Sequence, residues 1–124
     1  MTEFAMIASS FLLLMFAVTQ YALATYSYNL VAEAASEAAR YAAVHSPTSP
    51  NPATTAQIQA VATAAAPSLN PASLTTTPTW VSDPTSASQT DAKVVVSYPY
   101  TLTIPFVKSI SLTFTSTAQM IVSQ

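Results

Sequence analysis

The chain has 124 residues, of which 51% are hydrophobic and only 6% are charged, and its formal net charge is −2. Soluble domains average roughly 25% charged residues, and the three basic residues present are too few to form a nucleic-acid-binding patch. The absence of cysteine and glycine excludes a disulfide framework, a thiolate metal site and the glycine-rich loops that bind nucleotides. Turns must therefore be built from the nine prolines and from Asn, Asp and Ser.

The first predicted element is a helix that begins with a long apolar stretch, MTEFAMIASSFLLLMFAVTQYALAT. Residues 4–32 carry no charge, and residues 4–24 meet the length of about 20 apolar residues that a helix needs to cross a bilayer. Residues 25–29 are more polar and contain two tyrosines, as is typical of a membrane interface. We therefore expect residues 1–28 to form a transmembrane or filament-core segment.

A cleavable signal peptide is the alternative interpretation of this stretch. Ala22-Leu23-Ala24 offers a small-x-small cleavage site, and cutting there would release a secreted, soluble β-domain. Signal peptides, however, begin with a positively charged region. This chain begins with an acid, Glu3, and has no Lys or Arg before Arg40, which favours a retained helix.

The helix is predicted to continue through residues 29–45, NLVAEAASEAARYAAVH, as an amphipathic, alanine-rich segment. Alanine has the highest helix propensity, and no proline or glycine interrupts the pattern. One continuous helix over residues 2–45 would be about 65 Å long. Pro47 and Pro50 are expected to prevent it from extending further.

Residues 46–91 are rich in Pro, Ser and Thr and are expected to connect the helix to a C-terminal region. A short helix is predicted within this connection over about residues 54–66. Thr54 or Thr55 can cap its N-terminus, and Pro67 ends it.

In residues 92–124 the hydrophobic period changes to two, which indicates β-strands. Val94 and Val96 alternate with Val95 and Ser97, a similar run follows in residues 109–115, and Pro105 lies between the two runs. Residues 75–82 are a possible third strand. The predicted fold is therefore α+β, with a small antiparallel sheet packed on the second half of the long helix.

Three stretches resemble the TadE-like subunits of tight-adherence (type IVb, Flp-related) pili: TEF with the apolar run behind it, YNLVAEAASEAARYAAVH, and VVVSYPYTL with a closing strand. In that family an E-F or E-Y pair opens the apolar helix and an N-x(4)-A-A-x-E-A-A-R-Y-A-like stretch ends it. The latter reads here as Asn29, Ala34, Ala35, Glu37, Ala38, Ala39, Arg40, Tyr41 and Ala42. The resemblance covers nearly the whole chain and implies a type IV pilin-like architecture.

The resemblance also implies a function. It implies a structural pilin stored in the inner membrane, which polymerises into a helical filament of identical subunits on the cell surface and serves attachment. A pilus assembly platform and a prepilin peptidase are the implied partners, and no cofactor is implied. A low-copy minor pseudopilin or a pilus assembly factor, anchored in the membrane, is the alternative.

The chain departs from the family pattern in two places. Processed pilins of this broad class usually carry the acid as the fifth residue, whereas Glu3 is the third. Their precursors are cut after a glycine, and this chain has none. Whether and where a leader is removed does not follow from the resemblance.

Glu3 is the main candidate functional residue. An unpaired carboxylate in an apolar core costs several kcal/mol, so in a filament Glu3 would need a cation. The N-terminal amine of an adjacent subunit is the best one in reach, and that pair would fix the register between neighbours. The alternative is a first-turn acid that interacts favourably with the helix dipole and has no partner.

Three further groups of residues are predicted to act in assembly. Apolar side chains would pack in the filament core: Phe4, Phe11, Leu12, Leu13, Leu14, Phe16 and Tyr21. Small side chains would let a neighbouring subunit approach closely: Ala32, Ala35, Ser36, Ala39 and Ala43. Glu33, Glu37 and Arg40 either pair between subunits or support the helix locally, a contribution of about 0.2–0.5 kcal/mol per pair.

No catalytic arrangement is visible, and we expect a protein that is not an enzyme. His45 is the only histidine, and no acid lies within five residues of it. We interpret it as a helix C-terminal residue that interacts favourably with the dipole, rather than as a metal ligand.

Overall fold

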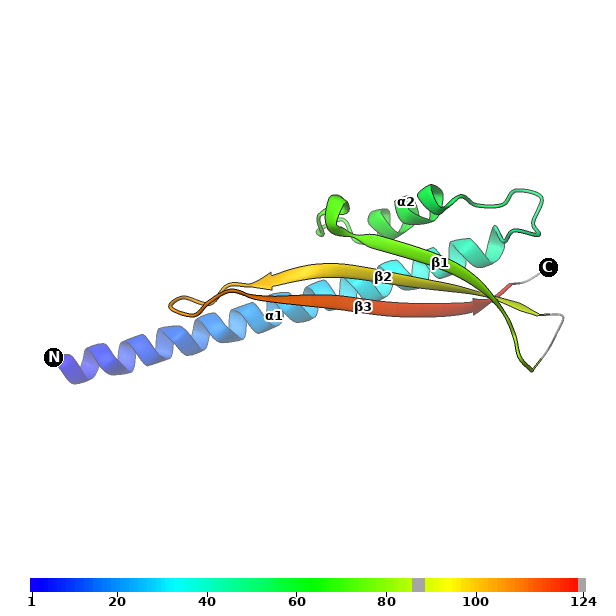
Figure 1. Cartoon of the computed structure of the whole chain (residues 1–124). Helices are drawn as coiled ribbons and strands as arrows, with labels where there is room; N and C mark the ends of the chain where they lie inside the picture. Colours follow the sequence, from blue (N-terminus) through cyan, green and yellow to red (C-terminus); the bar gives the residue numbers. More distant parts are fainter. Residues whose placement is uncertain (86–88, 123–124) are drawn as a thin grey trace.

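The computed structural model describes residues 1–85 and 89–122 of the chain. It contains one long helix, one short helix, a short 3₁₀ helix and a three-stranded sheet (Figure 1). The elements are α1 (Thr2–Val44), α2 (Thr55–Ala65), η1 (Pro71–Ser73), β1 (Thr75–Ser82), β2 (Thr90–Leu102) and β3 (Ile110–Ile121). The α+β fold predicted from the sequence, including the possible third strand, is confirmed.

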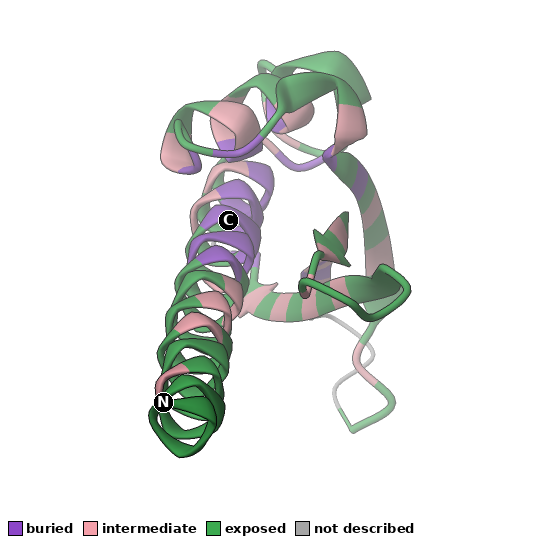
Figure 2. Cartoon of the chain, turned by 90° about the vertical axis from the view of Figure 1, so that its left-hand side faces the viewer, coloured by how far each residue is buried: buried purple, intermediate pink, exposed green. Residues whose placement is uncertain are grey.

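Helix α1 is a single unbroken helix of 43 residues that has two different environments. Its first half projects away from the rest of the protein, and its second half lies against α2 and the sheet (Figure 1). Figure 2 shows this division as exposed turns toward the N-terminus and buried turns behind them. The first buried residue of α1 is Ser27, so the protein's core begins only after the apolar segment.

Helix α2 begins with a capping box at Thr54, one of the two residues predicted to cap it. The Thr54 hydroxyl oxygen accepts a hydrogen bond from the Gln57 backbone N–H (3.3 Å), and the Thr54 N–H donates to the Gln57 side-chain oxygen (2.9 Å). These two bonds satisfy donors that a helix start otherwise leaves unpaired. The cap positions α2 so that Ile58 and Ala62 are buried in the core.

The three strands form an antiparallel sheet in the order β1-β2-β3. The register places Val94 of β2 opposite Pro78 on one side and Ala118 on the other, so these residues share a face. Ala92, Val94 and Val96 are buried on this inner face. The opposite, outer face carries exposed threonines of the edge strands: Thr75, Thr77, Thr79, Thr113, Thr115 and Thr117.

The core lies between the second half of α1, helix α2 and the inner face of the sheet. Alanines predominate on the α1 side, while the largest fully buried side chains are Ile58, Val31, Val94 and Val96. Short side chains on α1 allow both α2 and the sheet to approach its backbone closely. Close-packed interiors of this kind respond strongly to added volume.

The turn between β2 and β3 adopts an unusual backbone conformation at Phe106. The Val107 N–H donates to the Ile104 carbonyl oxygen (3.2 Å), which closes a four-residue turn with Pro105 second and Phe106 third. Phe106 has a φ of 66°, the left-handed value that a type II turn requires at this place and that glycine usually supplies. An L-residue there costs roughly 1–2 kcal/mol.

Candidate functional site

The apolar segment, residues 4–24, has no buried residue, and most of its side chains are exposed. Large side chains point outward throughout it, including most of the residues predicted to pack in a filament core: Phe4, Phe11, Leu12, Leu13, Leu14 and Tyr21. Phe16, the remaining one, is half-buried. A helix that is apolar all round belongs in a membrane or inside a larger assembly.

By length and composition, α1 is the one described helix that could cross a membrane. The core helix of a soluble protein can pass the same test, but the qualifying stretch of α1 has no part buried within the chain. A signal sequence also passes it, but α1 runs without a break through Ala24 into the core.

The serine and threonine hydroxyl groups within the apolar segment are satisfied by the helix itself. Ser9 and Ser10 both donate to the Met6 carbonyl oxygen (2.9 Å each), and Thr19 donates to that of Met15 (2.9 Å). Such bonds within one helix let polar residues enter an apolar environment at low cost. Within residues 4–24, the side chain of Gln20 and the hydroxyl of Tyr21 form no such bond with the described backbone.

Glu3 is exposed in the first turn of α1. Among residues 1–85 and 89–122 no group forms a hydrogen bond or an ion pair with its carboxylate. This placement leaves the carboxylate open to a partner outside the chain, and its pairing with a neighbouring amine stays a prediction.

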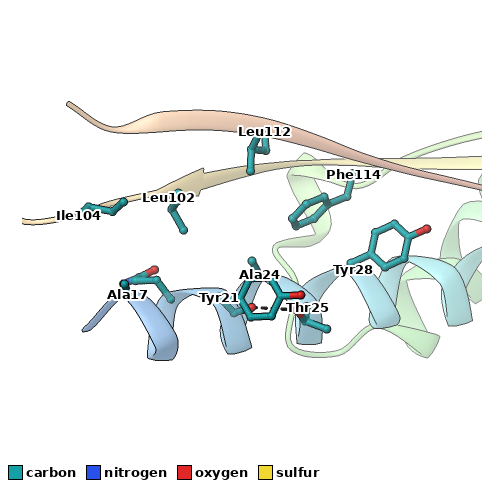
Figure 3. A pocket seen from close by; sticks show the side chains of 10 residues that line it. Ala17, Tyr21, Ala24, Thr25, Tyr28, Leu102, Ile104, Leu112 and Phe114 are labelled. Atoms are coloured by element: carbon teal, nitrogen blue, oxygen red, sulfur yellow. Dashed lines mark hydrogen bonds between the residues drawn. The ribbon is translucent and has the colours of Figure 1, made fainter. Parts of the chain in front are cut away.

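An apolar groove of about 600 Å³ lies between α1 and the ends of β2 and β3 (Figure 3). Leu102, Leu112 and Phe114 point from the sheet toward the helix (Figure 3). Its helix side is formed by Ala17, Gln20, Tyr21, Ala24, Thr25 and Tyr28, and its other side by the three sheet residues and Ile104. The groove thus starts beside the apolar segment and runs toward the core.

Aromatic rings close the groove at the end that meets the core. The Phe114 ring meets Tyr28 of α1 edge to face, with ring centroids 5.9 Å apart, and stacks on Tyr100 at 5.3 Å. Edge-to-face and offset-stacked pairs are the favourable arrangements of aromatic rings. This three-ring cluster joins the β2–β3 hairpin to α1.

The structure corrects the prediction for the small side chains of α1. Ala35, Ala39 and Ala43 are buried in the chain's own core, where they face α2 and the sheet instead of a neighbouring subunit. Ala32 is half-buried and Ser36 is exposed, so only these two remain open to a neighbour. The spacing of small residues therefore reflects the close approach of α2 and the sheet of the same chain to α1.

Glu37 and Arg40 form an ion pair one helical turn apart, with a distance of 3.1 Å between Glu37 Oε2 and Arg40 Nη2. Their side chains are 43% and 68% exposed. The pair therefore provides the local helix support considered in the sequence, while a role between subunits stays a prediction. Glu33 is exposed on the same helix and has no partner within the described part of the chain.

His45 is the C-cap of α1, as its position in the sequence suggested. Its ring stacks on Tyr41 at a centroid distance of 4.3 Å, and its Nδ1–H donates to the Tyr41 carbonyl oxygen (3.1 Å). No group of three or more His, Cys, Asp or Glu side chains that could hold a metal ion occurs in the described ranges.

Two features of the protein were not predicted from the sequence. They are the groove between α1 and the β2–β3 hairpin and the apolar turn between β2 and β3 at the open end of this groove. In the turn, the residue Phe106 is 101% exposed and the residue Val107 is 55% exposed. The available signal was a pair of bulky apolar residues directly after Pro105, where a polar turn is usual.

Comparison with protein-family models finds that residues 1–40 match the family described as TadE-like protein. The match covers most of α1, including Glu3 and Arg40, and neither α2 nor the sheet. The family resemblance stated from the sequence is therefore confirmed over these residues. Comparisons with curated proteins and with solved structures each found no significant match.

Proposed function

We propose, from the premise that residues 1–40 are TadE-like, that this chain is a structural subunit of a tight-adherence-type pilus. The apolar segment would hold the monomer in the inner membrane. Polymerisation of identical subunits through the same segment would then form an extracellular filament used for surface attachment.

One observation carries this proposal: a single helix is apolar and uncovered in its first half and buried in its second half. The uncovered half needs an apolar environment, which is lipid for a stored monomer and other copies for a filament. Transfer between these environments costs little because both are apolar. Association must then come from packing and from paired polar groups, as it does between helices in membranes.

The sheet supports the same proposal from the other side of the protein. Its outer face presents threonines and a single lysine, Lys93, rather than a large apolar patch. A polar face of this kind suits the solvent-facing surface of a filament. The proposed subunit would therefore face the filament axis with α1 and the outside with the sheet.

The test is to shear surface fibres from cells that express the full chain, image them, and measure the copy number and the N-terminal mass of the chain. A high copy number with residues 4–28 retained supports a structural subunit. A low-abundance chain confined to the membrane fraction would instead favour a minor pseudopilin or an assembly factor. A secreted chain without residues 1–24 would contradict the proposal.

The same N-terminal mass tests the proposed role of Glu3. A free amine near Glu3 supplies the cation that the carboxylate needs. A formylated or acetylated Met1 would remove that cation and contradict the pairing.

A further inference from the structure

We propose that the turn between β2 and β3, residues 103–109, enters the lipid bilayer beside α1 and is a second membrane contact of the stored subunit. This hairpin tip presents the exposed side chains of Phe106 and Val107. The inference rests on the proposed membrane storage of the subunit and adds a lipid-binding element to it.

The first argument is the position of the tip along α1. Ile104 and Ala17 line the same groove, whereas Phe114, farther along the hairpin, contacts Tyr28. The hairpin therefore points back along α1 toward its N-terminus, as Figure 1 shows. The apolar segment ends at Ala24. Since a helix rises about 1.5 Å per residue, Ala17 lies about 10 Å from Ala24 along α1, on its N-terminal side, which is the side that would lie deeper in the membrane.

The second argument is the thickness of the bilayer. If the tip lay outside the membrane, the membrane surface would meet α1 on the N-terminal side of Ala17. Only residues 2–16 would then remain to cross the bilayer, a length of about 22 Å. The hydrocarbon core is about 30 Å thick. Because that shorter stretch falls well short, the membrane surface must lie above Ala17 on α1, and the tip is then at the depth of lipid.

The third argument is the chemistry of the tip. Phe106 keeps a left-handed backbone conformation, although the residue is fully exposed and its ring gains no packing within the chain. Strained positions of this kind often occur where a side chain has a function. Insertion into lipid would give this ring the apolar contacts that the chain does not provide.

The remaining residues of the tip are compatible with the upper part of a leaflet. Pro105 has no backbone N–H, and the Val107 N–H is bonded to the Ile104 carbonyl oxygen, so these two residues leave no backbone donor unpaired. Lys108 is exposed, and a long lysine side chain can extend its ammonium group to the headgroups. Tyr21 and Tyr26 of α1 are exposed about 6 Å and 14 Å from Ala17 along the helix, on the side of the membrane surface, where interfacial aromatic residues are usual.

The experiment measures the depth of the tip in the full chain reconstituted in phospholipid vesicles. Because the chain has no cysteine, Val107→Cys provides a unique thiol for an environment-sensitive fluorophore while Phe106 is kept. Lipids with brominated acyl chains quench such a label only where it reaches the hydrocarbon. Phe11→Cys reports the apolar segment, and Val81→Cys, at the opposite end of the sheet, is the matched exposed control.

We expect the label at Val107→Cys to be quenched at least half as strongly as the label at Phe11→Cys and far more than the label at Val81→Cys. Quenching no greater than at Val81→Cys, with Phe11→Cys strongly quenched, would overturn the inference and leave the proposed function standing. Absence of quenching at Phe11→Cys would overturn membrane storage and the inference together.

A second variant separates insertion from folding of the turn. Phe106→Asn removes the apolar ring but suits the left-handed backbone, because asparagine tolerates positive φ. In the Val107→Cys background it should reduce quenching at least twofold, whereas Val81→Asn should leave quenching unchanged. Undiminished quenching in Phe106→Asn would contradict the role assigned to this ring.

Discussion

At the scale of single residues, Glu3 is the side chain whose environment would change most in the proposed assembly. In the isolated chain its carboxylate is exposed and has no partner within the described residues. In a filament the apolar segments of other copies would surround it. Since an unpaired buried charge costs several kcal/mol, its partner there would decide which arrangement of subunits is stable.

Glu3→Gln removes the charge and keeps the size of the side chain. We expect the free energy of unfolding of the monomer to be unchanged, because Glu3 makes no contact that stabilises the fold. Loss of a paired buried charge can cost about 3–5 kcal/mol, so the yield of sheared filaments should fall at least tenfold. The control is Glu33→Gln, an exposed acid on the same helix, and an equal loss of filaments in both variants would contradict a specific role of Glu3.

The Glu37–Arg40 pair is likewise expected to contribute little to the stability of the monomer. An exposed pair one helical turn apart contributes about 0.5 kcal/mol or less. Arg40→Ala should therefore leave the urea midpoint of the detergent-solubilised chain almost unchanged. Lys93→Ala, which removes a basic residue from the outer face of the sheet, is the matched control.

The filament yield of the same Arg40→Ala variant tests the second role. A large loss of filaments with unchanged stability would support an ion pair between subunits. An unchanged yield would restrict Arg40 to local support of α1.

At the scale of elements, the second half of α1 has one face for its own chain and another left for neighbours. Ala39 lies in the core, whereas Ser36, less than one turn away, is exposed. The same substitution at these two positions should therefore affect different properties of the protein.

Ala39→Leu adds volume where α2 and the sheet already approach α1 closely. Such overpacking typically costs about 1–3 kcal/mol, and thermal unfolding followed by circular dichroism should show a clear loss of stability. Ser36→Leu should change the stability by about 0.5 kcal/mol or less. Equal destabilisation by both substitutions would contradict the division of α1 into these two faces.

The helices α1 and α2 and the three strands were predictable because each is specified by local sequence. The unbroken α1 follows from the absence of proline and glycine over its length, and β2 follows from alternating residues such as Val94 and Val96. The role of Ala35 and Ala39 was not predictable in the same way. Small residues at helical spacing show that something approaches closely, but not whether it belongs to the same chain.

The groove and the hairpin tip were missed for a related reason. Both depend on where the hairpin lies along α1, and this placement results from tertiary contacts such as that between Tyr28 and Phe114. These residues are 86 positions apart in the sequence (114 − 28). No local sequence pattern predicts where along α1 the residue Ile104 lies.

At the scale of the whole molecule, the fold divides into two parts. The described residues that are buried in the core all lie at Ser27 or later in the chain, and the apolar segment contributes none of them. We expect a chain that starts at Gln20 to keep the helices and the sheet and to remain in solution without detergent. Its melting temperature by circular dichroism should lie within a few degrees of that of the full chain in detergent. Unfolding of the shortened chain would show that the apolar segment supports the core after all.

The continuity of α1 has a mechanical consequence. A fibre held at one end and pulled at the other places its subunits under tension along their long axes. In this protein the tension would pass through hydrogen bonds that run almost parallel to the helix axis, with no proline, glycine or loop between the apolar segment and the core to stretch first. Such a fibre should be stiff at small forces and lengthen only when turns of α1 begin to break.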